Sequence, residues 1–171
     1  MKKIFLFASA ILIATTGILF SSCNNEPAKT ADAPAFSLDS AKAAIAASNI
    51  VYGSCFATGD SVKFTSCYTA DACIYPPKML KLCGPQAISA FFNGAVKMGI
   101  RNLKLNTEEV MGSASAVAET GNYEVLGDKD ASLEKGKFIV LWKMENGKWK
   151  MYRDVWNSDT PPPPASPAEK K

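Results

Sequence analysis

The sequence predicts an α+β domain in which three helices come first and a curved mixed sheet of about six strands follows. Between residues 37 and 99, apolar side chains recur every three or four positions, which is the period of helices. Between residues 102 and 158 they alternate every two positions, which is the period of strands. Three helices are too few to seal such a sheet along its length, so we expect a cone with an open, partly apolar mouth.

The N-terminal segment has the features of a secretory signal. A basic "MKK" precedes the apolar run "IFLFASAILIATTGILF", and small residues precede Cys23. This order predicts a signal peptide over residues 1–22 of a bacterial lipoprotein, in which the Cys23 thiol receives a diacylglycerol. The protein would then be lipid-anchored to a membrane of the bacterial cell envelope, facing the periplasm or the cell surface. The alternative is a membrane-spanning anchor, because the apolar run approaches the length of a span.

The remaining chain divides into a tether, a domain and a tail. Residues 23–36 are polar and rich in Ala and Pro, which predicts a tether between lipid and domain. The domain is predicted over residues 37–160, and the Pro-rich tail over residues 161–171 is predicted to be disordered. The formal net charge is +3 and two lysines lie in the signal, so the mature chain is nearly neutral. No nucleic acid is therefore expected as a partner.

Four cysteines remain after Cys23, and these are Cys55, Cys67, Cys73 and Cys83. No two form a C-x-x-C motif and the chain has no histidine, so we expect no metal site and no cofactor. An exported domain can hold disulfides, and Cys73–Cys83 is the first pair to test. The apolar surroundings of each cysteine favour buried thiols instead. The missing histidine also excludes mechanisms in which imidazole activates a serine or cysteine.

Three helices follow from caps and apolar spacing. The first is predicted to begin after Ser37 and to end at Gly59. Its apolar face carries Leu38, Ala41, Ile45, Ser48, Tyr52, Cys55 and Phe56. A short second helix over residues 61–68 directs Val62, Phe64 and Cys67 toward the core. The third begins at Gly84-Pro85, where a first-turn proline loses no hydrogen bond, and ends at Gly99.

The strands are of two kinds. Short β-type runs at residues 72–75 and 79–83 flank a double proline and predict a small hairpin. Four long alternating segments then predict an antiparallel meander: "NLKLNTEEVMG", "SAVAETGNYEVLG", "GKFIVLWKME" and "KWKMYRDVWNS". Glycine-bearing turns such as "ENGK" separate them.

Several motifs in this order carry a family resemblance. They are "GD" at residues 59–60, "YTADA" at 68–72, "GPQAISAFF" at 84–92 and "AETGNY" at 118–123, followed by "GKFIVLWK" and "GKWKMYRDVWNSD". With this spacing the chain resembles the nuclear transport factor two-like superfamily, and within it the SnoaL-like and ketosteroid-isomerase-homologue domains. The resemblance covers about residues 38–159 and implies a cystatin-like α+β barrel with a ligand pocket.

The resemblance also argues against ketosteroid isomerisation. Those isomerases carry a tyrosine seven residues before "GD" as a hydrogen-bond donor, and Tyr52 matches it. Their general base is an aspartate directly before a proline, and the matching position is Pro76, which cannot accept a proton. Their second, protonated acid falls within "FIVLW", which contains no acid.

Strand parity supplies further candidates for a pocket. Glu119 and Tyr123 share one strand face, and Tyr152, Asp154 and Trp156 share one face of the last strand, opposite Met151, Val155 and Asn157. Phe138 and Trp142 are alternative lining residues. The candidate ligand-binding residues are Tyr52, Tyr75, Phe92, Glu119, Tyr123, Trp142, Asp154 and Trp156. Asp154, Glu119 and Tyr52 are also the candidate catalytic residues. The structural alternative for Tyr52 is core packing, and that for Asp154 with Arg153 is surface ion pairs or a buried hydrogen-bond network.

We therefore predict a membrane-anchored domain that binds a small, partly apolar molecule without a recognisable catalytic set. One alternative is a SnoaL-like lyase, cyclase or isomerase that uses a pocket carboxylate with Tyr52 or Tyr123. Another is an interaction module that forms a homodimer through the open face of the sheet.

Overall fold

In the computed structural model, which describes residues 35–161, helix α1 (Leu38–Thr58) begins directly after Ser37 and ends before Gly59. The Ser37 hydroxyl accepts a hydrogen bond from the backbone N–H of Ser40, and Gly59 adopts the left-handed conformation with φ at 68°. Both predicted boundaries are confirmed. The predicted signal peptide, most of the predicted tether and almost all of the predicted tail lie outside the described residues.

Helix α2 (Ser61–Ser66) is shorter than predicted, and its first turn is held by a residue whose capping role was not predicted. The carboxylate of Asp60 accepts a hydrogen bond from the backbone N–H of Lys63. Phe64 and Cys67 point into the core as expected, but Val62 is 79% exposed. A helix of less than two turns presents only a narrow buried face, so the prediction for Val62 was wrong.

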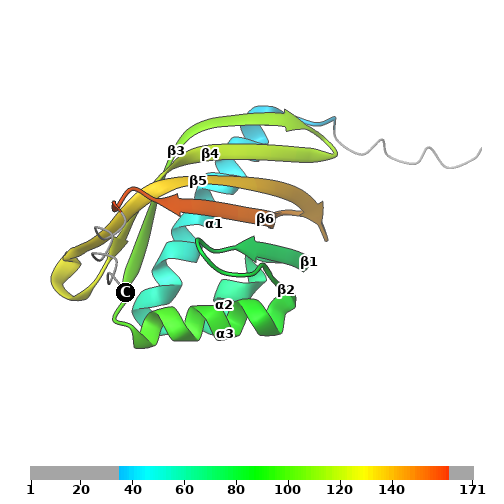
Figure 1. Ribbon diagram of the computed structural model, residues 1–171. Helices are drawn as coiled ribbons and strands as arrows, with labels where there is room; N and C mark the ends of the chain where they lie inside the picture. The colour runs from blue at the N-terminus through cyan, green and yellow to red at the C-terminus, as the bar shows by residue number, and fades with distance from the viewer. Residues whose placement is uncertain (1–34, 162–171) are drawn as a thin grey trace, which may run out of the picture. The chain divides into compact units, whose positions relative to one another are not determined.

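Helix α3 (Gly84–Lys97) buries Ile88, Phe92 and Ala95. The three helices lie on one side of a curved sheet, with α2 and α3 close together beneath strand β1 (Figure 1). None of the helices within residues 35–161 has the length and hydrophobicity needed to cross a membrane.

The sheet has six strands in the order β2-β1-β6-β5-β4-β3. The four long strands are β3 (Asn102–Ser113), β4 (Ala116–Leu126), β5 (Ser132–Glu145) and β6 (Lys148–Ser158), and the short 3₁₀ turn η1 (Asp128–Asp130) connects β4 to β5. They pair antiparallel as a meander, whereas β1 pairs parallel with β6. The predicted α+β class and the mixed, curved, unclosed sheet are thus confirmed.

The hairpin strands differ in length from the prediction. Strand β1 (Tyr68–Tyr75) begins four residues earlier than expected, because β6 offers it a parallel partner that the local pattern does not reveal. Strand β2 (Leu82–Cys83) has only two residues, and the exposed loop before it contains Met79 and Leu80.

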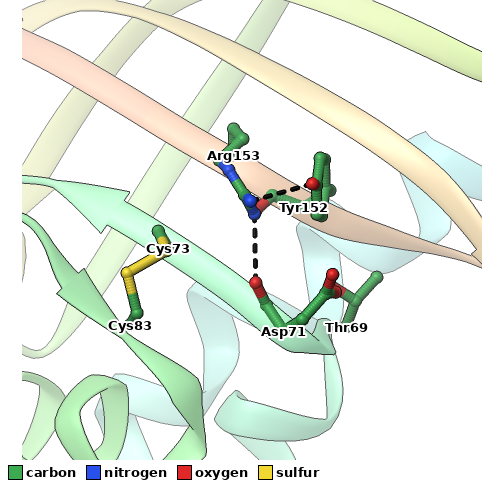
Figure 2. The surroundings of a disulfide bond; sticks show 6 residues. All are labelled: Thr69, Asp71, Cys73, Cys83, Tyr152 and Arg153. Carbon is green, nitrogen blue, oxygen red and sulfur yellow. Dashed lines mark hydrogen bonds between the residues drawn. A yellow bond between two sulfur atoms is a disulfide. The ribbon is translucent and has the colours of Figure 1, made fainter.

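A disulfide joins this hairpin. Cys73 and Cys83 are directly opposite each other in the β1–β2 pair, with Cα atoms 4.1 Å apart, and their sulfur atoms are bonded (Figure 2). Cys55 and Cys67 are free and buried. The expectation of buried thiols is therefore right for Cys55 and Cys67 and wrong for the bonded pair, because a cross-strand register brings Cys73 and Cys83 together.

Strand β6 contains a bulge that changes which face its side chains occupy. Leu141 pairs with Arg153 and the next β5 residue, Trp142, pairs with Met151, so Tyr152 is an extra residue without a partner. Met151 is consequently buried, and Tyr152 lies on the outside, where the Arg153 guanidinium covers its ring at 3.5 Å. The predicted grouping of Tyr152 with Asp154 was wrong for this reason.

The Arg153 side chain also connects the two parallel strands. It donates hydrogen bonds to the Tyr152 hydroxyl and to the backbone carbonyl of Asp71 on β1 (Figure 2). The Asp71 carboxylate accepts a hydrogen bond from the Thr69 hydroxyl, two residues earlier on β1. Asp71 therefore stabilises the local conformation of this strand.

Candidate functional site

A pocket of about 210 Å³ lies on the helix-covered side of the sheet. Six aromatic side chains line it: Tyr52, Phe56, Phe91, Tyr123, Phe138 and Trp156. They come from α1, α3, β4, β5 and β6, so elements from the whole length of the domain contribute to the wall. Aliphatic side chains, among them Met98, Ile100, Leu103, Val140 and Met151, complete a mostly apolar surface.

Asp154 on β6 is a buried acid in this wall. Its side chain is only 6% exposed, and its Oδ2 lies 2.7 Å from the Tyr68 hydroxyl. The same hydroxyl lies 3.1 Å from that of Tyr52. A hydroxyl has one proton and a carboxylate is the strongest acceptor here, so Tyr68 donates to Asp154 and its oxygen accepts from Tyr52. The three groups form a chain from α1 through β1 to β6.

Burial perturbs all three groups of this chain. The pKa of Asp154 is raised to about 6, chiefly by loss of hydration, while the hydrogen bond from Tyr68 opposes the rise and the nearby Glu119 adds to it. Desolvation, followed by the charge of Asp154, raises the pKa of Tyr52 and of Tyr68 well above the ordinary value. Asp154 can therefore accept or release a proton near neutral pH, whereas both tyrosines stay protonated and act as donors.

A second polar pair lies elsewhere in the pocket wall. The Tyr123 hydroxyl donates to Oε1 of Glu134, and the pKa of Tyr123 is raised by burial and by this carboxylate. A side chain at Gly136 would collide with the Tyr123 ring, since a Cβ atom there would lie 2.5 Å from it. The glycine therefore makes room for the tyrosine at this point of the sheet.

Glu119, another predicted site residue, is fully buried but lies outside the pocket lining. It accepts three hydrogen bonds, from the Asn49 amide at 2.7 Å, the Thr107 hydroxyl at 2.5 Å and the Trp142 indole N–H at 3.0 Å. A carboxylate with this many donors connects α1, β3, β4 and β5 within the core. Glu119 was predicted as a ligand-binding and catalytic candidate, and its three hydrogen bonds instead give it a structural place in the core.

The other predicted lining residues divide between the pocket and its surroundings. Tyr52, Tyr123, Asp154 and Trp156 line the pocket, as does Phe138, whereas Tyr75, Phe92 and Trp142 do not. Phe92 is in the core, with its ring 4.3 Å from Phe64 and 4.9 Å from Phe56 between centroids. The neighbouring Phe91, one residue earlier on α3, is the one that reaches the pocket.

Among the groups of the site that were not predicted are Tyr68, Glu134 and Met151. Tyr68 had a usable signal, because it is the first residue of the "YTADA" motif that contributes to the family resemblance. Glu134 had none, because it follows the irregular turn between β4 and β5. Met151 faces inward only because of the bulge at Tyr152.

The positions matched to ketosteroid isomerases carry no acid. Pro76 is buried and lies outside the pocket lining, and the lining residues within "FIVLW" are the apolar Phe138 and Val140. The buried acid of this pocket comes instead from β6. Among residues 35–161, no three acidic or cysteine side chains gather as metal ligands would.

Comparison with known proteins identifies the architecture. No family model matches the chain, and no curated protein matches it in sequence. Among solved structures, a domain of unknown function with a cystatin-like fold from Nostoc punctiforme superposes with a TM-score of 0.63 at 14% identity, covering 73% of this chain and 81% of its own. A nuclear transport factor two-like protein from Novosphingobium aromaticivorans has a TM-score of 0.61 at 14% identity, covering 70% of this chain and 82% of its own.

A third structure has the same architecture. A ketosteroid isomerase-like protein from Erwinia carotovora atroseptica superposes with a TM-score of 0.57 at 18% identity, over 70% of this chain and 96% of its own. At such identities the likeness establishes architecture. The described part of this chain therefore has the nuclear transport factor two-like, or cystatin-like, fold.

Proposed function

We propose that the protein is a ligand-binding domain, held at a membrane of the cell envelope by lipid on Cys23, whose pocket binds a small and mostly apolar molecule. One observation carries the proposal: a concave pocket lined by aromatic and aliphatic side chains contains a buried acid, Asp154. Apolar walls with few polar groups are typical of small-molecule sites, in which the walls supply affinity and the polar groups fix orientation.

The size of the pocket limits the ligand. An engineered protein cavity of about 150 Å³ holds one benzene molecule. The pocket found here has about 210 Å³, which suits a single ring with a short substituent and is small for a four-ring steroid. Size and the lack of an acid at position 76 both argue against a ketosteroid as the ligand.

A binding screen tests this proposal. The chain from residue 24 to 171, which contains every described residue, is purified and its mass is measured under native conditions to detect a retained molecule. A thermal-shift screen with single-ring compounds follows, and Phe138→Lys is the matched variant because it introduces a positive charge into the lining. We expect retained ligand or stabilisation with the parent chain and neither with the variant. Absence of both in the parent would contradict ligand binding.

Acid–base catalysis is a second candidate, favoured by the pKa of about 6 at Asp154. Asp154 would accept a proton from the bound molecule while the Tyr52 hydroxyl turns from Tyr68 to the ligand and donates a hydrogen bond to the developing charge. An Asp154→Asn variant would then lose turnover and keep its melting temperature. Loss of folding at neutral pH would instead assign Asp154 to structure.

Self-association is a third candidate, favoured by the outer face of the sheet. Ile139 and Val155 are paired neighbours there, 50% and 43% exposed, and Leu141 on β5 adds to the same face. An apolar face of this kind is typical of an interface. Light scattering of the parent chain and of Ile139→Lys distinguishes a dimer from a monomer.

A further inference from the structure

The carboxylate of Asp154 has no cationic partner in the domain. None of the four ion pairs among residues 35–161 includes it. The groups that face it are the Tyr68 hydroxyl from β1, Tyr52 from α1 and Glu119 from β4, and these are neutral or acidic. Tyr68 hydrogen-bonds Oδ2, and within the described part of the chain no donor reaches Oδ1.

An unpaired carboxylate that is 94% buried is a costly arrangement, since burial of a charge is unfavourable unless an opposite charge accompanies it. Two events relieve it. Asp154 takes up a proton, or a cation from outside enters the pocket that Asp154 lines. In the second case the pocket is a binding site for that cation.

The rest of the lining favours a cation. The faces of aromatic rings attract ammonium groups, and six aromatic side chains surround this pocket. Within residues 35–161 no lysine or arginine lines it, and the second charged lining residue, Glu134, is an acid that already accepts a hydrogen bond from the Tyr123 hydroxyl. An anion would therefore meet two carboxylates and no compensating charge, whereas a cation meets Asp154 without displacing an internal partner.

We propose that the ligand is a small organic cation, namely an ammonium group carried on an apolar body of about one ring. This inference rests on the proposed binding function and names the chemical class of its ligand. The ammonium donates to Oδ1 of Asp154, and the apolar body lies against the aromatic side chains, Phe138 and Trp156 among them. Tyr68 holds the carboxylate in place through Oδ2.

Three probes with the same ring and side-chain length separate charge from shape: 2-phenylethylamine, 2-phenylethanol and phenylacetate. Their affinities for the chain from residue 24 to 171 are measured by calorimetry at about pH 7.5, where the pKa of about 6 leaves Asp154 ionised. We expect the amine to bind at least about tenfold more tightly than the alcohol, and phenylacetate to bind weakest. If the alcohol binds as tightly as the amine, the cation proposal is overturned and the binding function stands. If no probe binds, the cation proposal is overturned, and the retained-ligand and thermal-shift measurements described above decide the binding function.

Variants assign the effect to Asp154. Asp154→Asn keeps the shape of the side chain, and we expect it to lower the affinity for the amine by at least about tenfold and to leave that for the alcohol within about twofold. Asp71→Asn, an exposed acid on β1 outside the lining, is the matched control and should change neither. Unchanged preference for the amine in Asp154→Asn would overturn the proposal.

A measurement on the unaltered chain keeps the proposal testable if Asp154→Asn does not fold. Lowering the pH from about 7.5 to about 5 protonates Asp154, and the affinity for the amine should fall by roughly tenfold. The affinity for 2-phenylethanol should stay constant over this range. Amine binding that does not weaken at low pH would contradict a role for the carboxylate.

Discussion

The Tyr68 hydroxyl donates a hydrogen bond of 2.7 Å to Oδ2 of Asp154, across 86 positions of the chain. This bond joins the first strand of the sheet to the last and points the carboxylate toward the pocket. The same Tyr68 oxygen accepts a hydrogen bond from Tyr52 on α1. A change at Tyr52 is therefore transmitted to Asp154 through the Tyr68 hydroxyl.

The stability of the domain should fall as the pH rises through the pKa of Asp154. Its pKa of about 6 in the folded state lies above the ordinary value of about 3.9, so the folded state holds this proton more tightly. The resulting stabilisation is complete below about pH 4 and is lost by about pH 7. It amounts to as much as about 3 kcal/mol at full effect. Urea unfolding over this range should show the decline in the parent and a flatter profile in Asp154→Asn.

Removing the Tyr68 hydroxyl should shift the pH-dependent loss of stability to higher pH. The hydrogen bond favours the charged form of Asp154, so Tyr68→Phe should raise its pKa by roughly one unit. The midpoint of the pH-dependent unfolding free energy reports this. Tyr75→Phe, on the same strand but outside the pocket lining, is the control and should leave the midpoint in place. An unshifted midpoint in Tyr68→Phe would mean that the bond does not favour the carboxylate.

Truncation of Glu119 should be strongly destabilising. Glu119→Ala leaves the donors of Asn49, Thr107 and Trp142 without their acceptor in the core, and we expect a loss of about 3 to 5 kcal/mol in urea unfolding. Glu109→Ala, at an exposed position on β3, should change stability by less than about 0.5 kcal/mol. Equal effects at both positions would contradict the role of Glu119 as a buried hub.

Two helical glycines should respond oppositely to alanine. A Cβ atom at Gly53 would lie 2.1 Å from the backbone oxygen of Leu103, where α1 crosses β3, so Gly53→Ala should cost about 2 kcal/mol or more. Gly94 on α3 has no atom within 4 Å of such a Cβ, and Gly94→Ala should stabilise by about 0.5 to 1 kcal/mol. Thermal unfolding of both variants measures the difference. A stabilised Gly53→Ala would contradict this helix–sheet contact.

The Cys73–Cys83 bond should be visible by peptide mapping. Trypsin cleaves after Lys78 and Lys81, within the loop that the bond closes, and releases peptides 64–78 and 82–97. We expect them as one linked mass that separates on reduction, with alkylated Cys67 in the first peptide because its thiol is free. The double change of both bonded cysteines to alanine should cost about 2 to 3 kcal/mol. Separate peptides before reduction would contradict the bond.

The sequence was sufficient for the order of elements because each helix and long strand has a local signal. Ser37 and Gly59 mark α1, and alternation marks β4, where Val117, Glu119, Gly121 and Tyr123 are all buried as parity requires. Strand β1 was predicted too short because its partner, β6, lies near the other end of the domain. No local pattern records a partner of that kind.

The site was harder to predict than the fold because periodicity gives the face of a side chain but not its depth. Phe138, Val140 and Trp142 all face inward from β5, yet Trp142 bonds to Glu119 in the core while the other two line the pocket. Trp142 differs from the other two in its position relative to the pocket, which the alternation of the sequence does not give. The same limit applies to Glu119, whose carboxylate faces inward but meets three donors of the core.

The bulge at Tyr152 has an evolutionary consequence. Because this residue is surplus to the β5–β6 register, deleting it restores regular alternation, with Met151, Asp154 and Trp156 still on the inner face. The domain would lose the stack of Arg153 on the Tyr152 ring and keep its acidic pocket wall. The strand is thus expected to tolerate loss of this one residue while the pocket presents the same side chains to a ligand.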